Sequence, residues 1–213
     1  MTHTASSAIA ACITTIGLGV AHAAPVSNGD FETGDFTGWS ISGSAAVTRD
    51  ADFRDFAGAT GSFPTGFFAA QFGNGDSPAT GVISQQFATI AAQEYQIELD
   101  YGRLGFGAGP QSLQLSLTNV SDGTVLFQTT ITDGTGDSNL ASLLDRYTYQ
   151  FFASGPATEL TLRDVSATTM STDGVLDNVR VTVVPEPTAL TLIALGAGLA
   201  CWRHRRRWIT RAL

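Results

Sequence analysis

Lysine is absent from this chain of 213 residues, and histidine and cysteine occur only at its two ends. The histidines are His3, His22 and His204, and the cysteines are Cys12 and Cys201. The stretch between these ends, residues 24–184, therefore cannot use Ser-His or Cys-His nucleophilic catalysis, Schiff-base chemistry or zinc sites of His and Cys. Disulfides are excluded there too, so the fold must be stabilised by its core or by bound ions.

Positive charge is scarce in the same stretch, which has 18 acidic residues against six arginines and a net charge of −12. A surface this acidic repels nucleic acid and anionic polysaccharide, so neither is expected as a direct ligand. Calcium, neutral glycans and plain solubility remain as reasons for the acids. The other five of the chain's 11 arginines lie close to the C-terminus.

The N-terminus carries an apolar run over residues 8–20, followed by Ala21-His22-Ala23. This order is typical of a secretory signal with a small-residue cleavage site. We therefore predict a signal peptide over residues 1–23 and a mature chain that begins at Ala24. The first seven residues contain no Lys or Arg, which is unusual for such a signal.

The C-terminus has a three-part pattern: Pro185-Glu186-Pro187, an apolar run from Thr188 to Trp202, and a basic cluster. The basic cluster consists of Arg203, Arg205, Arg206 and Arg207. The prolines keep the motif extended. As a helix the run would be roughly 22 Å long, which is short for a hydrocarbon core of about 30 Å unless interfacial residues extend it. We predict a short transmembrane helix over 188–202 with the basic stop, 203–207, in the cytoplasm. The alternative is a buried C-terminal helix of the globular domain.

This order of motif, apolar span and basic stop resembles the PEP-CTERM sorting tail of exported bacterial proteins. The resemblance implies a sorting protease or transpeptidase of the exosortase type as a partner. It also implies transient anchoring in the inner membrane and a final place at the cell surface or in the extracellular matrix. Such a tail is an address and carries no activity. Residues 185–213 are thus assigned to the tail, and 24–184 have the length of one domain.

Within residues 24–184, apolar and polar residues alternate with period two. The alternation is clear in 96–101, 113–117, 146–151 and 159–162. Asp122-Gly123 between two such runs indicates a hairpin, and no stretch shows a sustained helical period. Ten or so strands with one buried face predict an all-β fold, a two-sheet jelly-roll sandwich. Residues 50–66 and 133–142 are predicted surface loops, and the Gly-rich run 102–109 with Arg103 is a candidate binding loop.

Two segments at the ends of this domain carry a second resemblance. Residues 28–39 read N-G-D-F-E-T-G-D-F-T-G-W, and residues 174–181 read G-V-L-D-N-V-R-V. They are similar to the first and last strands of jelly-roll carbohydrate-binding modules and related galactose-binding-like sandwiches. In the calcium-containing members of that group, a Glu of the first strand and an Asp of the last strand hold a structural Ca²⁺. The corresponding residues here are Glu32 and Asp177.

The chemistry of these two residues agrees with a calcium site, because Ca²⁺ prefers carboxylate and carbonyl oxygens. By strand alternation, Asp177 shares a face with Val175, Val179 and Val181 and is expected on the apolar side. A carboxylate there is costly unless it binds a cation or is well hydrogen-bonded. A hydrogen-bonded carboxylate at the sandwich edge, or a pair with Arg180 or Arg49, is the alternative.

No sugar site stands out in the sequence. Trp39 is expected in the core, and Tyr95, Tyr101, Tyr147 and Tyr149 in the core or at sheet edges. The favoured function is a surface-sorted, non-catalytic protein that binds a neutral polysaccharide or belongs to an exopolysaccharide or biofilm matrix. One alternative is a purely structural matrix protein. The other is a glycoside hydrolase, which would need two carboxylates about 5–10 Å apart; no catalytic residue is predicted.

Overall fold

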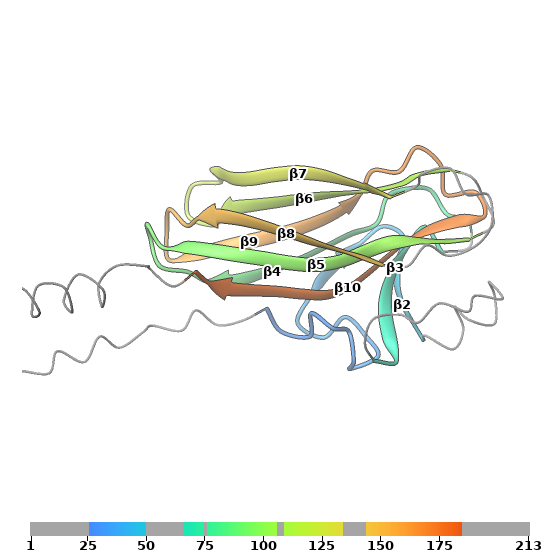
Figure 1. Ribbon diagram of the computed structural model, residues 1–213, viewed down its shortest axis with the longest axis horizontal. Coiled ribbons are helices and arrows are strands. Elements are labelled where there is room, and N and C mark those ends of the chain that lie inside the picture. The colour runs from blue at the N-terminus through green and yellow to red at the C-terminus, as the bar shows by residue number, and fades with distance from the viewer. Residues whose placement is uncertain (1–25, 50–65, 75, 106–108, 134–143, 185–213) are drawn as a thin grey trace, which may run out of the picture.

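The computed structural model describes residues 26–49, 66–74, 76–105, 109–133 and 144–184, and this part of the chain forms a sandwich of two antiparallel sheets (Figure 1). The first sheet has the order β1-β4-β9-β6-β7 and the second the order β2-β3-β10-β5-β8. The strands of the first sheet are β1 (Ser40–Ser42), β4 (Val82–Ala88), β9 (Ala157–Asp164), β6 (Gln111–Asn119) and β7 (Val125–Asp133). Those of the second are β2 (Ala45–Arg49), β3 (Phe68–Phe72), β10 (Thr172–Val183), β5 (Glu94–Gly105) and β8 (Asp145–Phe152). The prediction of an all-β jelly-roll sandwich is confirmed.

The core lies between the sheets and follows the alternation in the sequence. Leu113, Leu115 and Leu117 of β6 are fully buried, while the residues between them are only half-buried. The predicted hairpin is also present, with Gly123 at a φ of 71° in the turn between β6 and β7. Alternate side chains of an antiparallel strand point to opposite faces, so one face of each sheet forms the core.

The aromatic residues lie where the sequence placed them. Trp39 is 8% exposed, and Tyr95 and Tyr101 are almost completely buried. Tyr147 and Tyr149 pack against the core from β8, and Tyr149 meets the ring of Phe127 on β7 with centroids 5.2 Å apart. These rings close the sandwich between its two edge strands instead of forming a platform for a ligand.

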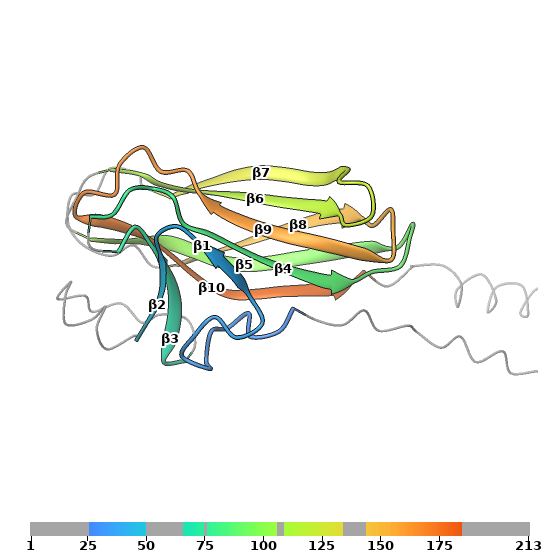
Figure 2. The ribbon, with the colours of Figure 1, turned by 180° about the vertical axis from the view of Figure 1, so that it is seen from behind.

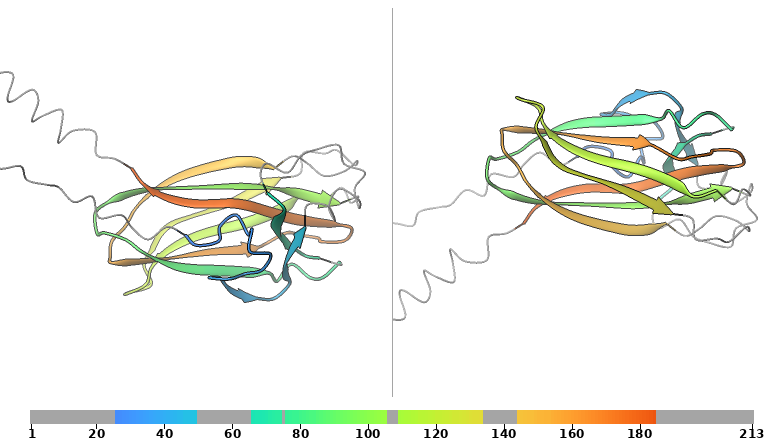
Figure 3. Two further views of the ribbon diagram at one scale, coloured as in Figure 1. Left: turned by 90° about the horizontal axis from the view of Figure 1, so that it is seen from below. Right: turned by 90° about the horizontal axis from the view of Figure 1, so that it is seen from above.

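The N-terminal segment, residues 26–39, closes the opposite long side, between β10 and β4 (Figure 3). Its backbone is bound to both sheets: Gln85 of β4 accepts from the Ser27 amide at 2.7 Å, and Gly29 accepts from the Val179 amide at 2.8 Å. Phe31 then fills the core from this side with no exposed surface.

The resemblance placed a first strand in residues 28–32, and this expectation is wrong. The segment consists of turns, and the first strand is β1, which begins at Ser40. Asn28 and Phe31 have positive φ angles of 48° and 55°, which interrupt an extended backbone.

The Gly-rich run was likewise placed in a loop, but residues 102–105 belong to β5. Gly102 pairs with Val175 and Gly105 with Thr172 of β10. Gly105 is required by this strand pairing, because a Cβ atom there would collide with the Ser171 carbonyl oxygen.

Several predicted segments lie outside the described residues. They are the signal peptide (1–23), most of the two surface loops (50–65 and 134–142) and the tail with its motif, apolar run and arginines (185–213). Among the described residues, no helix is long and apolar enough to cross a membrane.

Candidate functional site

Asp177 lies next to a bulge in β10, so residues before and after the bulge cannot be assigned to one face by simple alternation. Tyr101 pairs with Leu176 and Ile97 pairs with Val181, so Leu176 and Val181 face the core although five positions separate them. An odd spacing is possible only because a bulge between Asp177 and Arg180 adds a residue to the strand. Asp177 pairs with Asp100 on the outer face, so the expectation that it shares a face with Val181 is wrong.

Only 1% of the surface of Asp177 is nevertheless exposed to solvent. Its Oδ1 accepts from the Asn178 amide at 2.6 Å, and its Oδ2 accepts from the Asn178 side-chain nitrogen at 3.2 Å. Burial raises the pKa of this carboxyl to about 7, and the carboxylates of Asp100, Glu32 and Asp30 add to the rise. The charged form is therefore destabilised at neutral pH by its surroundings.

Glu32 reaches the same region from the N-terminal segment. Its Oε1 accepts from the backbone amides of Phe67 and Phe68, at 2.7 and 3.0 Å, at the start of β3. Gly66, with a φ of 96°, lies directly against this carboxylate and leaves no space for a side chain. Glu32 is thus held in place and acts on the charge of Asp177, so the structure brings the two predicted residues into one electrostatic neighbourhood.

This neighbourhood fits a cation in its chemistry. Asp177 is a buried carboxylate whose hydrogen bonds, among the described residues, come only from Asn178, and three further carboxylates raise its pKa. The alternative of an Asp177–Arg180 pair is not what the structure shows, because Arg180 donates to Asn178 Oδ1 at 3.3 Å instead. No cluster of three or more acidic, His or Cys side chains suited to a metal occurs in the described ranges. Calcium here would need backbone carbonyls or water to complete its six to eight ligands.

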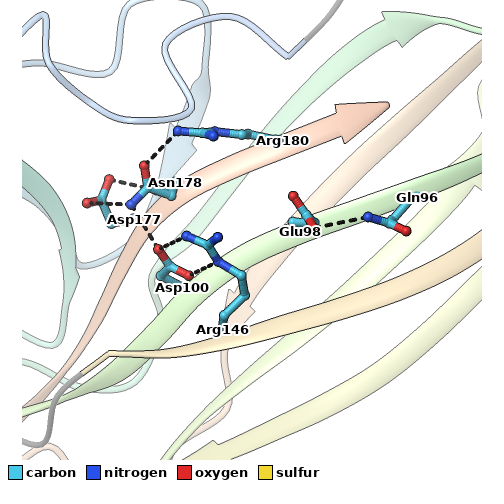
Figure 4. Close-up of polar contacts among 7 residues, drawn as sticks. All are labelled: Gln96, Glu98, Asp100, Arg146, Asp177, Asn178 and Arg180. Atoms are coloured by element: carbon cyan, nitrogen blue, oxygen red, sulfur yellow. Dashed lines mark hydrogen bonds and ion pairs between the residues drawn. The ribbon is translucent and has the colours of Figure 1, made fainter. Parts of the chain in front are cut away.

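A second polar arrangement continues from Asp177 across the outer face of the second sheet (Figure 4). Arg146 of β8 binds Asp100 of β5 with two parallel bonds, Nε to Oδ1 at 2.9 Å and Nη2 to Oδ2 at 3.1 Å. Asn178 of β10 donates to the same Asp100 Oδ2 at 2.9 Å. This bidentate pair is of the strong, geometrically defined kind, and it raises the pKa of Arg146.

The strand register extends this network into a regular pattern that we call the polar grid. It has three rungs across β8, β5 and β10: Arg146–Asp100–Asp177, Thr148–Glu98–Arg180 and Gln150–Gln96–Thr182. All nine side chains are polar, and Gln96 donates to Glu98 at 3.0 Å within the middle strand. With strands about 4.8 Å apart and alternate residues roughly 7 Å apart, the grid measures about 10 by 14 Å.

The outer face of the first sheet is different. It presents short hydroxyls and amides, such as Ser84, Ser116, Thr161 and Gln114, together with Arg163. The only hydrogen bond between side chains of this face, within the part of the chain that is described, joins Ser112 and Thr132 at 3.0 Å. The polar grid is therefore the more preorganised of the two. Asp100 and Asp177 are its buried base, and the side chains that reach solvent are those of Arg146, Thr148, Gln150, Arg180 and Thr182, with Gln96 and Glu98 partly exposed.

The sequence did not identify Asp100, Arg146 or Asn178 as site residues. The runs 96–101 and 146–151 were both recognised as strands, and their polar positions were visible. Only the pairing of the strands in the sheet places Asp100 opposite Arg146 and brings Asn178 within hydrogen-bond distance of Asp100. No signal in the sequence specifies that pairing.

The C-terminal residues 183–207 match the protein-sorting motif family described as PEP-CTERM. The chain carries a PEP-CTERM sorting motif. The match begins at Val183, the last residue of β10, and covers the predicted Pro-Glu-Pro, apolar run and arginine cluster. It indicates export and a membrane-anchored sorting signal, as the residues themselves suggested.

The sandwich resembles solved structures at low sequence identity. The galactotriose complex of TmCBM61 is 16% identical, covers 74% of this chain and 97% of its own, and has a TM-score of 0.51. Family 16 Carbohydrate Binding Module-2 is 15% identical, with coverage of 74% and 98% and a TM-score of 0.50. The K1 cleaved adhesin domain of Lys-gingipain from Porphyromonas gingivalis W83 is 12% identical, with coverage of 76% and 99% and a TM-score of 0.52. At these identities the likeness establishes the fold. No curated protein matches the chain in sequence.

Proposed function

We propose that this protein is exported, anchored briefly in the inner membrane by its tail and cut by an exosortase-type enzyme. It then stays at the cell surface or in an exopolysaccharide matrix, where its sandwich binds a glycan without catalysis. The sorting motif supports the route. The fold shared with carbohydrate-binding modules supports the binding role, while the ligand depends on the residues of the site rather than on the fold.

The polar grid is the observation that carries the binding proposal. Sugar hydroxyls are both donors and acceptors, and recognition needs amide, carboxylate and guanidinium groups held at fixed positions. Arg146 and Asp100 are locked together, and Asn178 fixes the rung beside them. Arg180 and Thr182 are exposed on β10 and can meet a ligand from solvent.

The expected ligand is a neutral polysaccharide. The domain's net charge of −12 disfavours an anionic chain, and the grid combines carboxylates with two arginines rather than presenting one sign. No aromatic side chain belongs to the grid, so stacking does not contribute there. If hydrogen bonds alone hold the ligand, we expect modest affinity, because each of them replaces a hydrogen bond to water.

Catalysis is disfavoured by the same residues. Asp177, with a pKa of about 7, has the raised pKa that a catalytic acid needs, but it is 1% exposed and cannot reach a glycosidic bond. Asp173, whose pKa burial raises to about 6, lies four residues away on the same strand, roughly 13 Å distant. That separation exceeds the 5–10 Å spacing of glycosidase carboxylates.

We also propose that Glu32 and Asp177 hold a structural Ca²⁺. Support comes from the buried charge of Asp177 and from the concentration of carboxylates around it. Calcium would neutralise these charges beside the bulge and join the N-terminal segment to β10.

The binding proposal is tested by screening residues 24–184 on a glycan array, with and without EDTA. Arg180→Gln should weaken binding roughly tenfold, because it removes a charge-assisted bond from the grid. Arg163→Gln, on the outer face of the first sheet, is the matched control and should bind as the native domain does.

If both variants lose affinity equally, the ligand does not bind specifically at the polar grid, and this assignment of the binding face is wrong. Absence of any binding would favour a purely structural role in the matrix. Release of reducing ends from the same polysaccharides above a heat-killed control would overturn the non-catalytic reading.

A further inference from the structure

Three turns and the last residues of β10 meet at the end of the sandwich from which the tail leaves; we call this the exit end. It comprises the turns 89–93, 119–124 and 153–156 and the end of β10. Figures 1 and 2 show the turn between β4 and β5 beside the point of the β10 arrow. Backbone bonds tie the turns together: the Thr89 amide donates to Pro156 at 2.9 Å and the Val120 amide to Ala157 at 3.2 Å. The exit end is therefore one continuous surface joined by backbone hydrogen bonds.

This surface carries four exposed apolar side chains. Phe152 is 62% exposed, Val125 54%, Ile90 42% and Val120 41%, and each lies in or next to one of the turns. They account for half of the large apolar residues exposed in the described part of the chain. Single exposed apolar residues are ordinary, but turns are normally polar, and here apolar residues recur at three of them.

The chain leaves this surface from a fixed point. The Val184 amide donates to Glu94 at 3.0 Å, and Gln93 Nε2 donates to the Val184 carbonyl at 3.1 Å. The apolar run of the tail begins at Thr188, only four residues on. Even fully extended, four residues span roughly 14 Å, so an anchored tail holds the exit end within that distance of the hydrocarbon boundary. The headgroup layer occupies roughly 5–8 Å of it.

From these observations we propose that the exit end rests on the lipid surface while the tail is uncleaved, with Phe152, Val120 and Ile90 in the interface. The inference rests on the proposed function, because it requires that the tail is anchored in the membrane. The attraction is apolar and not electrostatic, since the domain is strongly acidic and Asp122 lies in one of the turns.

The test uses the full-length chain in vesicles of zwitterionic phosphatidylcholine that contain headgroup-nitroxide lipid. Cys12 and Cys201 are first replaced by Ser, and an environment-sensitive fluorophore is attached through Phe152→Cys. Met170→Cys is the matched control, because Met170 is 72% exposed and lies at the opposite end, beyond β9. A third sample keeps Cys201 as the only labelled cysteine and reports insertion of the tail.

We expect at least a twofold stronger quenching at position 152 than at position 170, together with quenching at Cys201. Quenching at Cys201 with equal values at 152 and 170 would overturn this inference and leave the anchored tail intact. Absence of quenching at Cys201 would overturn the anchor and the inference with it. If position 152 is not quenched but Phe152→Ser slows tail removal in the native host, the exit end contacts the sorting enzyme and the lipid proposal is wrong.

Discussion

At the scale of single residues, Asp177 shows how an acid can be buried on the outer face of a sheet. Asp177 lies just before the bulge and points outward beside its pairing partner Asp100. Burial raises its pKa to about 7, while Asn178 supplies two hydrogen bonds. A carboxyl whose pKa is raised on folding binds its proton more tightly in the folded state. Its contribution therefore favours folding below the unfolded pKa and is lost as the pH rises through the folded pKa.

The first prediction concerns this pH dependence in EDTA. Between about pH 4 and pH 7, the native domain should lose up to about 4 kcal/mol through Asp177, since one pKa unit corresponds to about 1.4 kcal/mol. Asp177→Asn removes the titration, so the variant should match the native domain near pH 4 and be more stable, by about 1–3 kcal/mol, at pH 7.5. Urea unfolding across this pH range measures the difference. Parallel curves for the two proteins would show that Asp177 does not titrate in this range.

The second prediction is calcium stabilisation. A ligand bound only by the folded state adds about 2.7 kcal/mol at a hundredfold excess over Kd. Millimolar Ca²⁺ should raise the melting temperature of the EDTA-treated domain by roughly 5–10 °C. Glu32→Gln and Asp177→Asn should each remove this response, whereas Asp122→Asn, in an exposed turn, should retain it. If Ca²⁺ does not change the melting temperature of the native domain, Asp177 is a hydrogen-bonded carboxylate and not a calcium ligand.

At the scale of elements, the N-terminal segment, residues 26–39, contributes to both the core and the candidate cation site although it contains no strand. It closes the side of the sandwich between β10 and β4 and buries Phe31 against Trp39, with ring centroids 5.8 Å apart. Glu32 follows Phe31 directly, so the same turn that fills the core also places the carboxylate whose charge acts on Asp177. Core packing and the candidate cation site thus depend on one short stretch of chain.

The third prediction tests this segment. Phe31→Ala should destabilise the domain by about 3–5 kcal/mol, because it leaves a large cavity in the core. Phe67→Ala, at a position that is 75% exposed, is the control and should change stability by no more than about 0.5 kcal/mol. Urea unfolding in the presence of Ca²⁺ compares the two. A small effect for Phe31→Ala would mean that the segment is not an integral part of the fold.

At the scale of the whole molecule, the chain divides into an acidic sandwich and two ends of different chemistry. All Lys-, His- and Cys-dependent reactions are excluded from the sandwich by composition. Among its described carboxyls, the two with a raised pKa, Asp173 and Asp177, are too far apart to act together. The sorting motif begins at residue 183, where β10 ends. The sorting motif and the sandwich, to which we assign the proposed binding role, are therefore adjacent but separate parts of the chain.

The fourth prediction is processing at both ends. Protein recovered from its native host should lack residues 1–23 and the tail beyond the Pro-Glu-Pro motif, which leaves Trp39 as its one tryptophan. Intact-mass measurement gives both boundaries. A stable full-length form that contains Trp202 would contradict this prediction. A host without the sorting enzyme is not a fair comparison, because the tail would persist there for lack of its protease.

The sequence alone determined the all-β class, the packing of Trp39 and the tyrosines in the core or at sheet edges, the hairpin at Asp122-Gly123 and the sorting motif. These features depend on local alternation, turn chemistry or contiguous composition, all of which are written in consecutive residues. Only the tertiary structure decided the face of Asp177, because a single added residue in β10 reverses every side chain beyond it. The tertiary structure alone also paired Asp100 with Arg146 and placed Gly102 in a strand. It gave residues 28–32 a turn conformation instead of the expected strand. Those outcomes depend on contacts between segments far apart in the chain, which alternation within one segment does not specify.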